Sequence, residues 1–115
     1  MLTFIDFEYA GWDDPAKTVC DFFCQPAVPV PKRFIQLMSE AAAEGLDEPE
    51  LLFRRIDVLM PVYQLKWICI LLNEFLVTDG RRRAFASTGT DGEARKANQL
   101  AKARAMFNSV CCGAV

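Results

Sequence analysis

Apolar positions along most of the chain recur at the three- and four-residue spacing of amphipathic helices. This pattern predicts helices over residues 15–24, 32–44, 47–60, 62–77 and 91–110. Residues 2–7, by contrast, form a short run of β-branched and aromatic side chains that is typical of a strand. The pattern therefore predicts a mainly α fold with one short N-terminal β-strand, in a single domain over residues 1–115.

Several predicted helix ends carry capping residues. Asp14 followed by Pro15 is typical of a helix start, because the aspartate caps free N–H groups and proline suits the first helical position. Gly45 fits the left-handed position that ends a helix. Two pairs resemble capping boxes at the start of later helices, Asp47 with Glu50 and Thr90 with Glu93.

The most apolar stretch runs from residue 58 to residue 77. Pro61 either kinks a helix there or begins a new one. A membrane span needs about 20 mostly apolar residues with few charges. Because this stretch also holds Gln64, Lys66, Asn73 and Glu74, we expect the central helix of a protein core and no membrane contact.

Charge and cysteine content exclude several classes of function. The net charge is -2, and Arg81 to Arg83 form the only basic cluster, so we expect no nucleic-acid partner. The five cysteines form no C-x-x-C pair and there is no histidine, which excludes a Cys/His zinc site. An odd number of cysteines argues against a secreted disulfide framework, and we expect free thiols in a cytoplasmic protein.

One segment carries candidate chemistry, the D-x-E sequence of Asp6 and Glu8. On a strand, residues two apart point to the same face, so the two carboxylates project together at the strand end. Hard oxygen ligands of this kind suit Mg²⁺, which bridges nucleotide phosphates in phosphoryl transfer. The spacing alone also fits an exposed acidic pair with no ligand.

The wider segment 4–15, with the sequence Phe-Ile-Asp-Phe-Glu-Tyr-Ala-Gly-Trp-Asp-Asp-Pro, resembles the metal-binding segment of a known family. The family comprises small-molecule kinases of the aminoglycoside-phosphotransferase and choline-kinase type. Residues 65–75 also resemble a helix of that family's C-terminal lobe. The resemblance is specific over residues 3–24 and less so over 54–76. Thr18 departs from it, since many relatives carry an aspartate there.

The resemblance implies a protein-kinase-like fold of which this chain is the helical C-terminal subdomain. It implies that Asp6 binds the Mg²⁺ that bridges the phosphates of ATP or GTP, and that Glu8 supports or shares the ion. In this family C-terminal helices also wall the pocket of the small-molecule acceptor. Lys66, Asn73 and Glu74 are therefore candidate substrate-binding residues, or else the solvated stripe of their helix.

The family's catalytic loop, His-x-Asp-x-x-x-x-Asn, does not occur in this sequence, and neither does a Gly-rich phosphate loop. We therefore expect the chain to carry no catalytic residue, to be inactive alone, and to lie after those parts in a longer enzyme. A missing N-terminal part or a second copy would cover the lone strand. There are two alternatives to a part of a kinase: a non-catalytic helical module that binds a partner, and a binder of small apolar ligands.

Overall fold

The structure, a computed structural model, describes residue 3 and residues 11–76 and 92–112. These residues are mainly helical, as predicted, and no strand occurs among them. The predicted strand over residues 2–7 lies outside the described residues, apart from Thr3. So do Arg81 to Arg83 and the capping residue Thr90.

Helix α1 spans Pro15–Cys24, the range that the sequence predicts. Its N-terminus is capped by Asp14, whose carboxylate oxygen Oδ1 accepts a hydrogen bond from the backbone N–H of Ala16 at 3.0 Å. Pro15 occupies the first helical position, where its missing N–H has no helical partner to lose. Local chemistry thus fixes the start of α1.

After α1 the chain passes through a proline-containing connection into a short 3₁₀ turn, η2 (Lys32–Phe34), and helix α2 (Ile35–Ala43). The sequence predicts one helix over 32–44, and the structure gives its first turn the tighter 3₁₀ form. Gly45 follows α2 with φ at 82°, the left-handed conformation predicted for it. The backbone N–H of Leu46 then donates to the carbonyl of Ala43 at 3.0 Å, which closes the turn.

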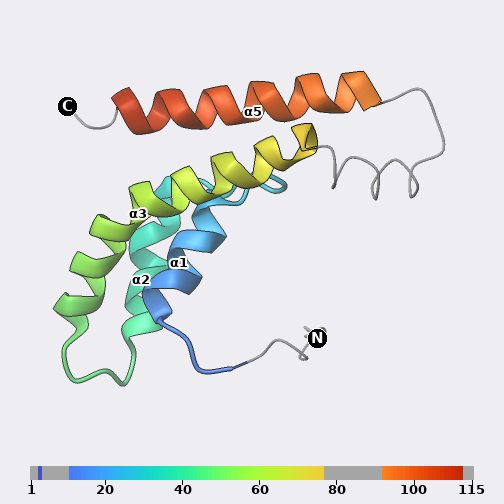
Figure 1. The fold of residues 1–115 in the computed structure, drawn as a ribbon. Helices are drawn as coiled ribbons and strands as arrows, with labels where there is room; N and C mark the ends of the chain where they lie inside the picture. The colour runs from blue at the N-terminus through green and yellow to red at the C-terminus, as the bar shows by residue number, and fades with distance from the viewer. Residues whose placement is uncertain (1–2, 4–10, 77–91, 113–115) are drawn as a thin grey trace.

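Helix α3 is continuous over Pro49–Leu72, and a 3₁₀ turn, η3 (Asn73–Phe75), extends it. The predicted capping box at Asp47 is wrong, because the N-cap residue is Glu48 and its side chain makes no capping hydrogen bond. Instead, Pro49 occupies the first helical position of α3, which proline favours. Pro61 lies inside the helix and begins no new one, and the axis of α3 bends along its length (Figure 1).

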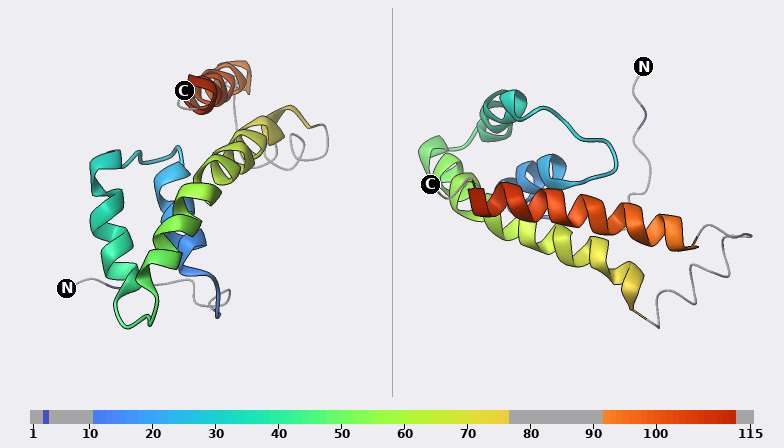
Figure 2. Two further views of the ribbon diagram at one scale, coloured as in Figure 1. Left: turned by 90° about the vertical axis from the view of Figure 1, so that its left-hand side faces the viewer. Right: turned by 90° about the horizontal axis from the view of Figure 1, so that it is seen from above.

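Helix α3 joins two separate apolar clusters. Its first half packs on α1 and α2, where the larger cluster includes Val19, Cys20, Leu52 and Ile56. Its second half packs on α5 (Gly92–Cys112), where Ile68 and Leu71 meet Ala103. Figure 1 shows α5 running along the yellow half of α3, and both views in Figure 2 keep α5 apart from α2.

The central position predicted for the apolar stretch is confirmed, but the expected burial is not. Val62 and Leu65 are about half exposed, because α1, α2 and α5 together cover only one side of α3. In α5, Phe107 follows Ala103 by four positions, a spacing that puts both side chains on one face of a helix. Phe107 is exposed and Met106 packs on the small cluster in its place.

Residues Pro49–Phe75 form one helical stretch that is long and apolar enough to cross a membrane by length and composition. Only a small part of its most apolar window is buried by the rest of the protein. Between Val58 and Phe75 the charged side chains are Lys66 and Glu74, and both form ion pairs with neighbouring helices. Those ion pairs favour a helix packed within a protein, and the absence of membrane contact stays a prediction.

Candidate functional site

The predicted metal ligands, Asp6 and Glu8, lie outside the described residues. Over residues 11–76 and 92–112, no group of three or more Asp, Glu, Cys or His side chains is placed to hold a metal ion. The metal assignment therefore rests on the sequence. Two carboxylates at a spacing of two fit Mg²⁺ in donor chemistry, because the ion takes one or two carboxylates together with phosphate oxygens.

Asp21 of α1 is the polar junction between the two segments that resemble the kinase family. Its Oδ1 accepts hydrogen bonds from Lys66 Nζ at 2.8 Å and from Trp67 Nε1 at 3.0 Å. Its Oδ2 lies 3.0 Å from the same Lys66 nitrogen and 3.8 Å from Lys17 Nζ. One carboxylate therefore fixes the register between α1 and the second half of α3.

A second set of charges surrounds the start of α1. Lys17 Nζ lies 2.9 Å from Asp13 Oδ2, and this hydrogen bond lowers the pKa of Asp13 and raises the pKa of Lys17. Asp14 pairs with Arg55 of α3 in addition to capping the helix. The turn that follows the predicted metal-binding segment is thus tied to both α1 and α3.

Glu74 and Arg95 connect η3 with the first turns of α5. The guanidinium nitrogen Nε of Arg95 donates to Glu74 Oε1 at 2.6 Å. Only 4% of the Glu74 side chain is exposed. A buried carboxylate is costly unless it is paired, so loss of Arg95 would leave an uncompensated charge between η3 and α5.

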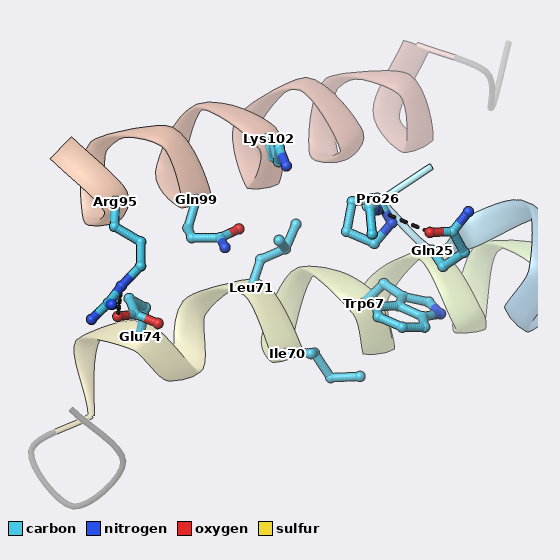
Figure 3. Close-up of a pocket in the computed structure, with 10 residues that line it drawn as sticks. Gln25, Pro26, Trp67, Ile70, Leu71, Glu74, Arg95, Gln99 and Lys102 are labelled. Atoms are coloured by element: carbon cyan, nitrogen blue, oxygen red, sulfur yellow. Dashed lines mark hydrogen bonds and ion pairs between the residues drawn. The ribbon is translucent and has the colours of Figure 1, made fainter. Parts of the chain in front are cut away.

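A hollow of about 540 Å³ lies between α3, α5 and the connection that follows α1. Figure 3 shows Trp67, Ile70 and Leu71 on its α3 side and the ion pair of Glu74 with Arg95 at one end. The remaining lining comes from α5 and the connection: Gln25, Pro26, Ala27, Gln99 and Lys102. Its walls therefore combine an indole and aliphatic side chains with charged and amide groups.

Gln99 carries the polar group of this hollow that stands out. Its Oε1 atom is buried and accepts no hydrogen bond from the residues that the structure describes. Figure 3 shows the side chain extending from α5 toward α3, into the space beside Leu71. A buried acceptor of this kind costs free energy unless a donor reaches it. A small molecule with hydroxyl or ammonium groups would supply that donor.

The three candidate substrate-binding residues do not come together. Lys66 lies in the junction with Asp21, whereas Glu74 lines the hollow beside Arg95. Asn73 is the C-cap residue of α3, and its backbone N–H bonds to the carbonyls of Cys69 and Ile70. The alternative that the three form one solvated stripe does not hold either, because Glu74 is buried.

Sequence reasoning missed Asp21, Arg95 and Gln99. Asp21 carries a usable signal, since it is the one acidic residue of a mostly apolar helix and follows Lys17 by four positions. Arg95 carries none, because its partner Glu74 lies 21 residues earlier in the chain, and Gln99 carries none, because the hollow it lines forms only when α5 packs on α3. Trp12, just before α1, is fully exposed.

The cysteines are free, as expected, and fall into two kinds. Cys20 and Cys24 are buried against α3, and Cys20 Sγ donates to the carbonyl of Ile56 at 3.7 Å. Burial raises the pKa of each of these two thiols to about 11, so they are protonated and unreactive at neutral pH. Cys69, Cys111 and Cys112 are exposed.

Comparison with known proteins gives no relatives. No family model, no curated protein sequence and no solved structure matches the chain at a significant level.

Proposed function

We propose that this chain is the helical C-terminal subdomain of a small-molecule phosphotransferase, together with its metal-binding segment. The enzyme transfers the terminal phosphate of ATP or GTP to a hydroxyl group of an aminoglycoside-, choline- or sugar-like acceptor. In this proposal Asp6 binds Mg²⁺ and Glu8 supports it. The catalytic base and most nucleotide contacts come from another part of the enzyme, so the chain alone is inactive.

The observation that carries the proposal is the direct contact between the two segments that resemble the family. Residues 3–24 and 54–76 meet at Asp21, which binds Lys66 and Trp67, and at the thiol of Cys20, which donates to Ile56. The two segments resemble parts of one enzyme family in the same order along the chain, and here they pack against each other. The capped start of α1 then follows the Asp6 segment directly, which suits a helix that supports a metal site.

The hollow between α3 and α5 supports the choice of acceptor class. Gln99 Oε1 offers an oxygen acceptor, and the Trp67 ring forms an adjacent apolar wall. Polyhydroxylated amines present hydroxyl and ammonium donors on a compact apolar frame, and these match the two kinds of surface. We therefore assign the acceptor side of the enzyme to this hollow.

The test is phosphate transfer by the complete gene product with γ-labelled ATP and GTP and a panel of hydroxylated amines and sugars. Asp6→Asn keeps the shape of the side chain and removes its charge, so turnover is expected to fall more than about 100-fold. The matched control is Asp13→Asn, which removes an exposed carboxylate seven residues later and should retain activity. Equal turnover in both variants would remove the metal assignment.

A non-catalytic helical module that binds a partner is the second candidate. The exposed outer face of α3, which carries Val58, Val62 and Leu65, favours it. This candidate predicts that no acceptor in the panel is phosphorylated and that a partner increases the stability of the chain. Stoichiometric phosphate transfer that depends on Asp6 would exclude it.

A further inference from the structure

The hollow between α3 and α5 carries two polar groups to which the described residues give no partner. One is the buried amide oxygen of Gln99, which accepts no hydrogen bond from those residues. The other is the ammonium group of Lys102, which forms no ion pair with them. Figure 3 shows both side chains on the side of α5 that faces α3. A ligand that fills the hollow therefore has to donate one hydrogen bond and accept another.

The charges on the lining select against a positively charged ligand. Glu74 and Arg95 neutralise each other through their ion pair at 2.6 Å. Among the described residues that line the hollow, Lys102 then carries the remaining charge, which is positive. A ligand ammonium group would be repelled by Lys102 and could accept no hydrogen bond from it, because an ammonium group only donates. Of the acceptors proposed above, the sugar-like kind without an amine is thus favoured.

A hydroxyl group meets both hydrogen-bonding requirements. It donates through its hydrogen and accepts through its oxygen, so two hydroxyls of one ring can donate to Gln99 and accept from Lys102. The same property satisfies the Gln99 amide whichever of its two polar ends faces the ligand. Gln99 and Lys102 are three residues apart on α5, which places them on one face of the helix within reach of a single small molecule.

The indole of Trp67 supplies the apolar surface that a sugar ring needs. Its Nε1 donates to Asp21 at 3.0 Å, and Asp21 is not part of the lining, so the indole offers carbon atoms to a ligand. A pyranose ring carries hydroxyls around its edge and C–H groups on its two faces, and those C–H groups pack on aromatic side chains. Because the hydrogen bond holds the indole in place beforehand, binding costs little side-chain entropy.

We propose that this hollow binds an uncharged sugar ring, with Trp67 against one face of the ring and with its hydroxyls bound to Gln99 and Lys102. The volume of about 540 Å³ lies within the range of about 300–1,000 Å³ that is typical of small-molecule sites. The inference rests on the proposed function only where it makes this sugar the phosphate acceptor. Binding itself needs no nucleotide and is tested without one.

The first test is calorimetric titration of the complete gene product with the methyl pyranosides of glucose, galactose and mannose. We expect at least one of the three to bind. Gln99→Leu keeps the approximate size of the side chain and removes its acceptor, so it should weaken binding at least about tenfold. The control Gln36→Leu makes the same change at an exposed position of α2 and should leave binding unchanged. Circular dichroism verifies that both variants fold.

The second test compares the neutral sugar with the amino sugar of the same configuration at pH 6, where the amine is protonated. The dissociation constant of the amino sugar should be at least about threefold higher, because Lys102 repels its ammonium group. Lys102→Gln should abolish this difference. The control Lys96→Gln should preserve it, since Lys96 is also on α5 but pairs with Glu93 and does not line the hollow.

Three outcomes would overturn the proposal: no binding of any of the three pyranosides to the folded protein, equal binding by Gln99→Leu and wild type, or tighter binding of the amino sugar. The outcomes for the proposed function are separate. A sugar that binds through Gln99 and is never phosphorylated would leave the binding site standing and refute the kinase assignment. Phosphate transfer to an amine, with no sugar bound in the hollow, would do the reverse.

Discussion

At the scale of single residues, Asp21 is the group on which most of the polar structure depends. It accepts from a lysine and from an indole of α3, and about a quarter of its side chain is exposed. An exposed ion pair contributes about 0.2–1 kcal/mol, whereas a hydrogen bond to a charged group contributes about 1.5–3 kcal/mol. The bond from Trp67 is therefore the larger share of what Asp21 contributes.

We predict that Asp21→Ala lowers the free energy of unfolding by about 2 kcal/mol, because it removes both partners of the carboxylate. Urea unfolding followed by tryptophan fluorescence and circular dichroism measures the change. Asp13→Ala is the matched control, since it removes an exposed carboxylate just before α1 whose salt bridge is with Lys17 four positions later, and it should cost less than about 0.5 kcal/mol. Equal losses in the two variants would contradict the assigned role of Asp21.

Thiol reactivity separates the two kinds of cysteine. At pH 8 and at concentrations where the chain is monomeric, we predict that iodoacetamide modifies the exposed Cys69, Cys111 and Cys112. Cys20 and Cys24 should remain unmodified until the protein unfolds, because burial raises each pKa to about 11. Intact mass and peptide mapping identify the modified sites. Rapid modification of Cys20 would contradict the packing of α1 on α3.

The same pKa shifts give a pH dependence of stability. Each buried thiol has a folded-state pKa above its ordinary value of 9.0, so the fold favours the protonated form. The resulting stability is complete below about pH 9 and is lost as pH rises toward 11. We predict that the unfolding midpoint of the wild type falls over this pH range. The fall is expected to be smaller in Cys20→Ala, which has lost one of the two thiols. An equal fall of the midpoint with pH in the wild type and in Cys20→Ala would contradict this prediction.

At the scale of elements, α3 determines the arrangement because its two faces lie in different surroundings. One face packs on α1, α2 and α5, and the opposite face exposes Val58, Val62 and Leu65. An apolar helix that packs on one side only is unusual for a soluble protein, because apolar surface gains free energy when water is removed. These exposed side chains are thus the part of α3 that the described helices leave uncovered.

Two residues on α3 test this division. Ile56 is 3% exposed and Val58 is 73% exposed, although they lie only two positions apart. In the monomer we predict that Ile56→Ala costs about 2–5 kcal/mol of unfolding free energy, since it opens a cavity in the larger cluster. Val58→Ala should cost less than about 0.5 kcal/mol by the same urea titration. Comparable losses would mean that α3 is rotated from the position described.

Local sequence predicts the elements whose ends depend on neighbouring residues. Asp14 and Pro15 locate the start of α1, and Gly45 locates the turn after α2, because capping and positive φ are decided within a few residues. The continuity of α3 across Pro61 is not predictable in this way. It depends on clusters on both sides of the proline, which outweigh one lost backbone hydrogen bond.

The candidate site was also hard to predict from the sequence, because it too depends on contacts between distant elements. Glu74 appears polar and solvated from its position in the helix pattern, and its burial results from Arg95 on an element 21 residues later. The hollow likewise forms only when α5 packs on α3. Long-range contacts of this kind depend on tertiary packing, for which periodicity carries no information.

At the scale of the whole molecule, the described residues contain a large cluster and a small one joined by α3. The small cluster consists of Ile68, Leu71 and Ala103 with Met106 beside it. Such a core offers few apolar contacts, and low local contact density is typical of segments that open before the rest of a protein. Helix α5, and with it one wall of the hollow, is therefore the least stable part of this arrangement.

We predict that native-state hydrogen exchange is faster in α5 than in α1 and in the first half of α3. Ala103→Gly removes a buried methyl group from the small cluster and should accelerate exchange in α5 while leaving α1 unchanged. The control Ala97→Gly makes the same change at an exposed position of α5, so it reports helix propensity alone. Uniform exchange across the helices would show that the molecule opens as one unit.

The proposed phosphotransferase role depends most directly on one metal ligand. The measurement that tests it is Mn²⁺ titration of the complete gene product in the presence of ATP, followed by electron paramagnetic resonance, with wild type, Asp6→Asn and Asp13→Asn. The account predicts that Asp6→Asn weakens Mn²⁺ binding at least about tenfold, and that Asp13→Asn binds as wild type does. Equal Mn²⁺ binding in all three proteins would contradict the account.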